Sequence, residues 1–375
     1  MSEPIRVLHV VVAGELGGAE RMLADLAAPG GMRGVAHTVA LLPASPRLEP
    51  FFLAAGLTVS AHPLRAEGPI GYLQNAFSEA RLAWLQGVAY QTRAQLLHVH
   101  TIGSQVLGTR AALHLGLPVV RTEHSSRAFD DLTAWPFSRW SLQRATASVA
   151  ISKHIAQTVC ARAPWAAAKL RTIANGVDTD RYAFTPMPPR DPAAPFRFVM
   201  SGRLDPRKGI DIALCALALT PEVVLDVVGD GPSRSELETL SAKLRVSSRV
   251  RFHGYQSDVR PHLANSHAVL SASRNEGLGL AVLEAMAMGR PAVAVPVGGL
   301  PEFVDRRTGV LAHACTPQAL SQAMRELAAC SSPQERADAA RARVVERYSL
   351  RAMRDGYAAL YHELALSAQM QSTSS

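Results

Sequence analysis

Short runs of apolar residues alternate with amphipathic stretches through both halves of the chain. The predicted strands of the first half are 5–13, 37–42, 57–62, 95–100, 118–124 and 147–152, and those of the second half are 196–202, 223–229, 249–254, 267–273 and 291–296. Continuous apolar strands separated by helices are typical of parallel sheets that are covered on both faces. Because the pattern occurs twice, we expect an α/β protein with two Rossmann-like, doubly wound domains that face a central cleft.

A proline-rich stretch separates the two patterns. "FTPMPPRDPAAP" contains five prolines, which remove backbone donors and fix φ, so that it forms neither a helix nor a central strand. We therefore expect an N-terminal domain over 1–183, a linker over 184–195 and a C-terminal domain over 196–348. Residues 349–366 have a helical pattern, and we expect this helix to return to the N-terminal domain.

The composition supports this division and excludes several classes of protein. With 375 residues, 48% hydrophobic and 19% charged, the chain is globular and long enough for two domains. It contains no run of 18 apolar residues, and "MSEPIRVLHVVVAG" reads as a first strand because no basic region precedes its apolar part. Four cysteines that are far apart in the sequence are typical of free thiols in a reducing compartment. We expect a cytoplasmic protein.

The net charge of +8 has two interpretations. The chain lacks a basic run with interleaved aromatic residues, so we do not expect nucleic acid as a partner. A basic surface could hold the protein at an anionic membrane, at the inner face of the cytoplasmic membrane. It could equally be a solvated face.

The segment "NEGLGLAVLEAMAMGRP" (275–291) places a loop and a helix after a predicted strand. Glu276 lies in the loop, and Glu284 lies about one turn into the helix. Carboxylates accept hydrogen bonds from vicinal hydroxyls, and the exposed amides near Gly277 and Gly279 can donate to phosphate oxygens. The segment can therefore hold a sugar nucleotide. The alternative is that Glu284 caps the helix and Glu276 is merely exposed.

Two other loops that follow strands carry glycine and basic residues. "AGELGGAER" places Gly17 and Gly18 before a helix, where glycine allows a close backbone approach and the helix N-terminus favours phosphate. "SGRLDPRKGID" places Arg203 and Lys208 before another helix, and two cations there suit a diphosphate. The alternatives are a tight turn in the first loop and a solvated turn in the second.

Two further patterns could be taken for metal sites. "DTD" (178–180) has the Asp-x-Asp spacing of a metal site, but it lies just before the proline-rich stretch. "HVH" (98–100) places two histidines on one face of a strand, whereas a metal needs at least a third ligand. A contact between His100 and an acceptor is a second reading of that motif. We expect no metal and no other cofactor.

Six motifs, in order, resemble those of the retaining glycosyltransferases of family 4, which have the GT-B fold. "EGLGLAVLE" matches their E-x7-E motif, and "GRLDPRKGID" is similar to their G-R-L-x-x-x-K-G segment. "GGAER", "TEH", "NGVDTDRY" and "VGDGPSRSEL" also resemble motifs of the family. The resemblance extends to about residue 360 and gives the Asp-x-Asp pattern a structural role.

The resemblance implies a donor site on the second domain. Glu284 would bind the ribose hydroxyls, and Glu276 would hold the donor sugar. Arg203 and Lys208 would hold the diphosphate and stabilise it as it leaves. The amides that would support the donor belong to Gly277, Leu278, Gly279 and Leu280.

The resemblance also implies contributions from the first domain. Gly17 and Gly18 would lie against the phosphates or the acceptor, and His124 of "TEHSS" would lie beside the donor sugar and the reacting centre. The residues with an implied catalytic role are His124, Arg203, Lys208 and Glu276.

The resulting hypothesis is a hexosyltransferase-type enzyme that moves a sugar from a UDP- or GDP-sugar to an acceptor hydroxyl with retention. We expect a glycan or lipid-linked saccharide of bacterial exopolysaccharide or lipopolysaccharide biosynthesis as the acceptor. The stretch "PFSRWSLQRA" could contact a lipid, or could pack within its own domain. Two alternative functions are a sugar-nucleotide epimerase of the same fold and a non-catalytic relative in a polysaccharide assembly complex.

Overall fold

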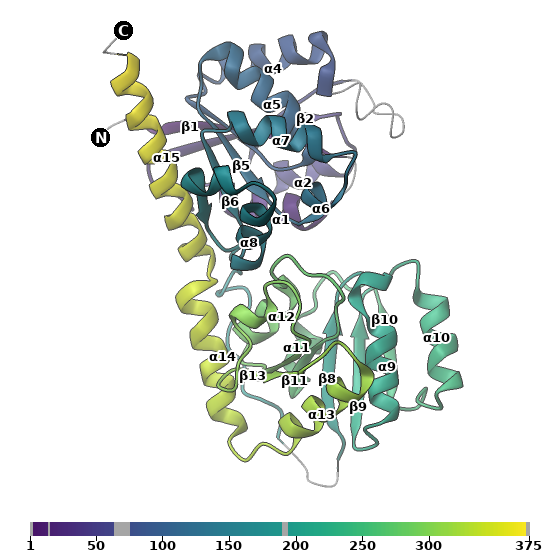
Figure 1. Cartoon of the computed structure of the whole chain (residues 1–375). Coiled ribbons are helices and arrows are strands. Elements are labelled where there is room, and N and C mark those ends of the chain that lie inside the picture. Colours follow the sequence, from purple (N-terminus) through teal and green to yellow (C-terminus); the bar gives the residue numbers. More distant parts are fainter. Residues whose placement is uncertain (1–2, 14–15, 64–75, 190–193, 373–375) are drawn as a thin grey trace. The chain divides into compact units, whose positions relative to one another are not determined.

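The chain folds into two compact units. The computed structural model describes residues 3–13, 16–63, 76–189 and 194–372 (Figure 1). The first unit comprises Met1–Gly176 together with Leu350–Ser375, and the second comprises Val177–Ser349. Each unit contains one parallel sheet with helices around it, so the α/β prediction is confirmed. Within the described ranges, no helix has the combination of length and hydropathy that a bilayer crossing demands.

The first unit is built on a seven-stranded sheet in the order β3-β2-β1-β4-β5-β6-β7. Its strands are β1 (Ile5–Val12), β2 (Val35–Leu42), β3 (Thr58–Ala61), β4 (Leu96–Val99), β5 (Val119–Glu123), β6 (Ala147–Ala150) and β7 (Leu170–Thr172). All neighbouring strands pair in parallel. The strand order reverses between β1 and β4, and ligands of such sheets bind beside this point, at the carboxyl ends of the strands.

The second unit is built on a six-stranded parallel sheet in the order β10-β9-β8-β11-β12-β13. Its strands are β8 (Phe196–Ser201), β9 (Val223–Val228), β10 (Val250–Gly254), β11 (Ala268–Ser271), β12 (Ala292–Ala294) and β13 (Gly309–Leu311). Here the order reverses between β8 and β11. The edge strands β7 and β13 were not predicted, because three residues are too few to show a pattern.

Helices connect consecutive strands in both units, as parallel pairing requires. Those of the first unit are α1 (Gly18–Ala27), α2 (Leu48–Ala54), α4 (Glu79–Gln91), α5 (Ile102–Leu115), α6 (Arg127–Asp130), α7 (Trp135–Arg144), α8 (Lys153–Arg162), η1 (Pro164–Lys169) and α15 (Leu350–Ser372). Those of the second are η2 (Pro206–Lys208), α9 (Ile210–Ala218), α10 (Arg234–Lys243), α11 (Arg260–Ala264), α12 (Leu280–Ala287), η3 (Leu300–Glu302), α13 (Pro317–Ala328) and α14 (Pro333–Arg347). Several begin at a side-chain cap; for example, the Ser152 hydroxyl accepts from the amide of Ile155 at the start of α8.

The C-terminal helix α15 is part of the first unit and continues to Ser372, six residues beyond the predicted end. It buries residues at helical spacing against β1 and its neighbours, which explains its length. The buried side chains are Met353, Tyr357, Leu360, Tyr361, Leu364 and Ala365. In Figure 1 it is the yellow helix beside the first sheet.

The two units divide between Gly176 and Val177, before the proline-rich stretch begins. The first residues of that stretch belong to the second unit, because the buried guanidinium of Arg290 donates to the backbone oxygens of Thr185 and Pro186. Part of the predicted linker, residues 190–193, lies outside the described residues.

Candidate functional site

A pocket opens at the carboxyl ends of β8 and β11, on either side of the point where the strand order of the second sheet reverses. Such a position is the one at which an open α/β sheet binds its ligands. The pocket is lined by Met200, Ser201, Gly202, Arg203, Leu204, Lys208, Ile210, Val227, Val228, Val269, Leu270, Ser271, Ser273, Glu276, Gly279, Ala281 and Val282. Arg203, Lys208, Glu276 and Gly279 were predicted from the sequence as site residues, and the fold brings them to this one pocket.

An ion pair crosses the pocket between two of its loops. The Nζ of Lys208, at the end of η2, donates to Oε1 of Glu276 over 2.5 Å. The same oxygen accepts from the hydroxyl of Ser273 over 2.8 Å. Glu276 is therefore held by two donors, and its side chain is only 14% exposed. Ser273 was missed by the sequence analysis, although it lies in the predicted strand immediately before the motif.

The basic residues of the η2 loop differ in their surroundings. Arg203 is exposed at the pocket, and its side chain forms no ion pair with any residue in the described ranges. Arg207 pairs with Asp205 over 2.7 Å, and its side chain is 74% exposed. Arg203 and Lys208 are therefore the cations that can meet an anion in the pocket, whereas Arg207 faces solvent.

Four successive backbone amides at the start of α12 could bind an anion. Within the described part of the chain, the N–H groups of residues 277–280 donate to no other residue. Free amides at a helix N-terminus, next to a positive helix dipole, favour phosphate oxygens. The four residues are Gly277, Leu278, Gly279 and Leu280.

Glycines hold this loop in place by allowing close backbone packing. Gly279 has φ +103°, and a Cβ there would lie 2.7 Å from a methyl group of Leu300. Gly298 has φ +60°, and a Cβ there would lie 1.8 Å from the carbonyl oxygen of Glu276. Both positions need glycine for conformation and for space. Gly298 was not predicted, although the Gly-Gly pair after β12 is a visible signal.

Glu284 is the fifth residue of α12 and is partly exposed. It does not line the pocket described above. Its predicted contact with a ribose stays a prediction.

The predicted site residues of the first unit lie in two loops after strands of its own sheet. Gly17 precedes α1, where its amide donates to the carboxylate of Glu20 over 2.9 Å, and Gly18 is the first residue of the helix. Residues 14–15 of this loop lie outside the described residues. Gly17 and Gly18 belong to the first unit, and their predicted contact with the phosphates or the acceptor stays a prediction.

His124 directly follows β5, the strand that carries a buried ion pair. Arg121 and Glu123 lie 2.9 Å apart, and their side chains are 0% and 1% exposed. Burial lowers the pKa of His124 to about 4, although the Glu123 carboxylate raises it. The imidazole is therefore neutral at pH 7, and its Nε2 is buried without a hydrogen-bond partner among the described residues.

Asp178 of the "DTD" pattern has a structural role. Its carboxylate accepts from the backbone amides of Asp180 and Arg181 over 3.0 and 2.9 Å. Such a turn occupies the carboxylate with the protein's own backbone, in agreement with the role that the resemblance implied.

The fold and pocket define an α/β protein with a ligand pocket where the strand order of its second sheet reverses, and comparison with known proteins identifies the family. Residues 16–181 match the family described as "Glycosyltransferase Family 4", and residues 189–343 match "Glycosyl transferases group 1". The chain therefore belongs to the family 4 glycosyltransferases.

Individual relatives agree with this assignment. The chain is 33% identical over 192 residues to the lipopolysaccharide core biosynthesis glycosyltransferase LpsE of Rhizobium meliloti, covering 50% of this chain and 56% of that protein. It is 33% identical over 261 residues to the D-inositol 3-phosphate glycosyltransferase of Mycolicibacterium gilvum, covering 62% and 58%. The alignments thus span little more than half the length of these relatives.

A solved structure shows the same fold over almost the whole chain. The crystal structure of HepE from Anabaena, in complex with UDP and glucose, superposes with a TM-score of 0.78 and 23% identity, covering 96% of this chain and 100% of HepE. The predicted GT-B fold is confirmed.

Proposed function

We propose that this protein transfers a sugar from a nucleoside diphosphate sugar to an acceptor hydroxyl with retention of the anomeric configuration. The observation that carries the proposal is the arrangement of Lys208 and Glu276 beside the free amides of residues 277–280. The amides and cations suit a diphosphate, and the carboxylate suits sugar hydroxyls. A UDP complex of a structure with the same fold agrees with such a donor.

In the proposed reaction, the bond between the anomeric carbon and a diphosphate oxygen breaks. The acceptor oxygen bonds to the same face of that carbon, and its proton passes to the departing diphosphate. Arg203 and Lys208 would stabilise the negative charge that develops on the diphosphate. Glu276 is not the nucleophile of a double displacement in this proposal, because its carboxylate is needed to bind the hydroxyls of the donor sugar.

The donor site can be tested by a thermal-shift screen with UDP, GDP and ADP and their sugar conjugates. A ligand that binds the folded protein raises the midpoint of unfolding, so one nucleoside diphosphate should give a clear shift. Glu284→Ala should abolish that shift, whereas the control Glu326→Ala, at an exposed position of α13, should preserve it. No shift with any nucleotide would contradict the proposal. Retention of the shift in Glu284→Ala would contradict the ribose contact.

We also propose that the reaction needs no metal ion. Lys208 and Arg203 supply positive charge at the pocket, which a metal would otherwise bring to the diphosphate. Transfer should therefore continue at an unchanged rate after dialysis against EDTA. A loss that Mg²⁺ or Mn²⁺ restores would contradict this part.

For the acceptor, we propose a lipid-linked saccharide of bacterial surface polysaccharide biosynthesis. One supporting observation is the similarity to a lipopolysaccharide core glycosyltransferase. Another is an apolar groove on the first unit, bordered by α5 and α7. It is lined by Phe77, Val106, Arg110, Pro136, Phe137 and Trp140.

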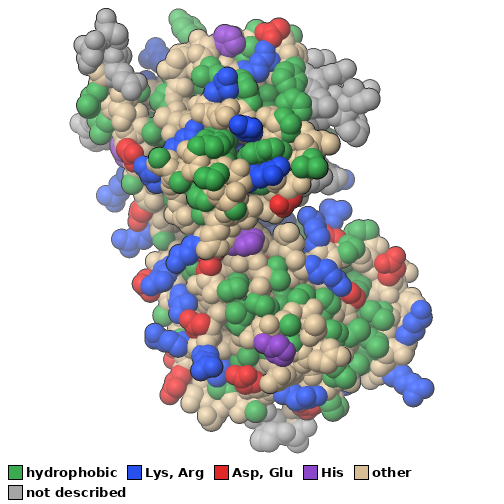
Figure 2. Space-filling model, viewed as in Figure 1, with side chains coloured by type: hydrophobic (Ala, Val, Ile, Leu, Met, Phe, Trp, Pro, Cys, Tyr) green, Lys and Arg blue, Asp and Glu red, His purple; other side chains and the backbone are tan. Residues whose placement is uncertain are grey.

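The surface around this groove combines apolar and basic side chains. Phe77 is 49% exposed and Leu132 is 76% exposed, while the guanidinium of Arg144 stacks on the ring of Trp140. In Figure 2, apolar and basic side chains alternate over the part of the first unit where Figure 1 shows α5 and α7. Aromatic and arginine side chains together suit the boundary of an anionic lipid layer.

Sedimentation with liposomes tests the membrane part of the proposal. Vesicles with anionic lipid should pellet the protein, and Trp140→Ser with Phe137→Ser should reduce the pelleted fraction severalfold. The matched control is Trp165→Ser, which removes an exposed tryptophan of the same unit on η1, away from the groove. Failure of the wild-type protein to pellet, or an equal loss in the control, would contradict a membrane-binding role of the groove.

A further inference from the structure

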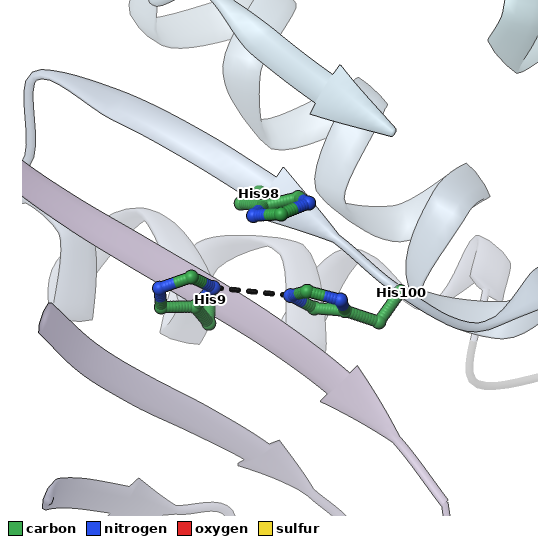
Figure 3. A group of neighbouring side chains, drawn as sticks. All are labelled: His9, His98 and His100. Carbon is green, nitrogen blue, oxygen red and sulfur yellow. Dashed lines mark hydrogen bonds between the residues drawn. The ribbon is translucent and has the colours of Figure 1, made fainter. Parts of the chain in front are cut away.

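Histidines from neighbouring strands gather in the centre of the first sheet. His9 on β1 lies opposite His98 on β4 in the strand register, and His100 directly follows β4. The exposed fractions of His9, His98 and His100 are 0%, 0% and 4% (Figure 3). Burial lowers the pKa of all three well below the usual value, so that each is neutral at pH 7.

Two hydrogen bonds connect three imidazoles into a chain. Nδ1 of His37, on β2, lies 2.9 Å from Nε2 of His9. Nδ1 of His9 lies 3.0 Å from Nε2 of His100, which is the dashed line in Figure 3. His98 is outside this chain, because its Nδ1 and Nε2 each lie 2.7 Å from a hydroxyl oxygen, of Tyr361 and of Thr122.

A metal ion is the first ligand to consider for three clustered histidines. The ligand atoms of His9, His98 and His100 all lie within 4.8 Å of one another. Both nitrogens of His98 are already hydrogen-bonded to hydroxyl groups, and both nitrogens of His9 are bonded to other imidazoles, so only Nδ1 of His100 could ligate without breaking a bond of the core. A single ligand does not make a stable site, and we do not propose one.

The end atoms of this hydrogen-bonded chain of imidazoles suit a different ligand. Three neutral imidazoles have three N–H groups and three bare nitrogens, and the two hydrogen bonds use two of each. One end must therefore carry an N–H and the other a lone pair. The end atoms are Nε2 of His37 and Nδ1 of His100, and both are buried without a partner among the described residues.

The charge beside His37 indicates which end carries the proton. The guanidinium of Arg354 lies close enough to lower the pKa of His37, with burial as the larger cause. A positive charge favours the lone pair on that side. A buried N–H without an acceptor costs more than a bare nitrogen, and His37 lies near the amino end of β2, whereas His100 follows the carboxyl end of β4, where a ligand can supply the acceptor. Nδ1–H of His37 therefore donates to Nε2 of His9, and Nδ1–H of His9 donates to Nε2 of His100. The remaining N–H is on Nδ1 of His100.

This N–H lies where a ligand of the first unit would bind. His100 follows β4 at the point where the strand order reverses, and its backbone amide is held by the Ser104 hydroxyl over 3.0 Å. His124 follows the adjacent strand β5, with its ring centroid 5.8 Å from that of His100. Nε2 of His124 is also buried and unpartnered within the described ranges. Nδ1 of His100 and Nε2 of His124 are therefore two polar groups at neighbouring strand ends that a ligand could bind.

We propose that Nδ1–H of His100 donates to a hydroxyl oxygen of the acceptor saccharide, and that His37 and His9 are positioning residues that fix this tautomer. The inference rests on the proposed function for the identity of the ligand. The tautomer itself follows from the hydrogen-bond chain of the first unit.

The tautomer can be measured directly on the full-length protein labelled with ¹⁵N-histidine at pH 7. The chain has 13 histidines, and the signals of His100 are assigned by their loss in His100→Gln. We expect a protonated Nδ1 and a bare Nε2 in the wild-type protein, and both tautomers in His37→Leu, where His9 loses its donor. A protonated Nε2 in the wild-type protein, or an unchanged tautomer in His37→Leu, would overturn the assignment.

The ligand contact is tested by titrating methyl hexopyranosides into the labelled protein. At least one sugar should shift the Nδ1–H resonance of His100. Its affinity should fall about tenfold in His100→Gln, whose amide reaches only the Nε2 position, and less in His100→Asn, whose amide replaces Nδ1. If no sugar perturbs His100, or if both variants bind as the wild type does, the contact is refuted.

Two further measurements separate this inference from its alternatives. The nucleoside diphosphate that shifts the midpoint of unfolding of the wild type should shift that of His100→Gln by the same amount. The absence of any shift in the wild type would refute the proposed donor site and leave the measured tautomer unaffected. Zn²⁺ should not perturb the signals of His9, His98 and His100. If it shifts all three together, the cluster is a metal site and the proposed contact is wrong.

Discussion

Nζ of Lys208 and Oε1 of Glu276 lie 2.5 Å apart, although 68 residues separate them in the sequence. The pair joins the loop after β8 to the loop after β11, two strands that are adjacent in the sheet. In the proposed reaction, a diphosphate would compete with Glu276 for Lys208. Glu276 would then be free to turn to the hydroxyls of the donor sugar.

Lys208→Ala should lower kcat by about 100- to 1000-fold, because it removes one charged donor from the developing charge of the diphosphate. Its effect on the free energy of unfolding should stay within about 1 kcal/mol, since the side chain is 30% exposed and such pairs contribute little. Steady-state transfer rates and urea denaturation measure the two effects.

Arg207→Ala is the matched control, because it removes a neighbouring cation whose side chain is 74% exposed and paired with Asp205. It should leave kcat within about twofold of the wild type. An unchanged kcat in Lys208→Ala would reject the leaving-group role, and an equal loss in both variants would reduce it to a general effect of charge.

The Lys208–Glu276 pair also illustrates what the sequence can predict. Each residue was predicted from its own loop, because glycine, charge and the start of a helix leave a local signal. Their direct contact depends on β8 and β11 being neighbours, and strand order is a property of the whole sheet. The contact of Ser273 with Glu276 was missed for the same reason, since a serine in a strand has no pattern of its own.

Gly298→Ala should weaken donor binding at least tenfold. A Cβ at this position would lie 1.8 Å from the carbonyl oxygen of Glu276, and the φ of +60° adds backbone strain for any other residue. The loop that carries Glu276 would have to move away from Lys208. Thermal shift with the nucleotide that the wild type binds measures the loss.

Gly87→Ala is the control, because the same substitution should increase stability at this position. Gly87 lies inside α4, and a Cβ there would meet no atom within 4 Å. It should raise stability by about 0.5–1 kcal/mol and leave nucleotide binding unchanged. Normal donor binding in Gly298→Ala would show that the loop does not need this close packing.

Arg121→Met should reduce the free energy of unfolding of the first unit by about 3–5 kcal/mol, because it leaves the Glu123 carboxylate buried without its cation. Arg121 also donates to the carbonyl oxygen of Ser138 over 2.7 Å. All four tryptophans, Trp84, Trp135, Trp140 and Trp165, belong to the first unit, so their fluorescence in urea reports on this unit.

The exposed pair of Arg171 and Glu363 provides the comparison. Their side chains are 45% and 56% exposed, and Arg171→Met should cost less than about 1 kcal/mol. A similarly small cost for Arg121→Met would show that water reaches the Glu123 carboxylate and that the pair is not buried in solution.

The histidine cluster could not be predicted from the sequence beyond the "HVH" pattern. His9 and His37 stand in ordinary apolar strands, and only the order β2-β1-β4 places them beside His100. From the sequence, this pattern could be a metal site, which needs a third ligand, or a contact of His100 with an acceptor. The register supplied the third histidine, and the hydrogen bonds of His9 and His98 then favoured the contact over the metal.

The stability of the first unit should fall as the pH decreases below about 6.5. Burial lowers the pKa of His37 and of His124 to about 4, so the unfolded chain binds protons that the folded chain does not. The contribution of these two groups to the free energy of unfolding is complete above pH 6.5 and is lost as the pH falls toward 4. At pH 5 the loss is about 2 kcal/mol for each group. Urea denaturation followed by tryptophan fluorescence between pH 5 and 8 measures this loss.

His37→Asn, whose amide can replace Nδ1 in the bond to His9, should show a shallower decrease than the wild type. A stability that stays constant between pH 7 and pH 5 would mean that these imidazoles reach water in the folded protein.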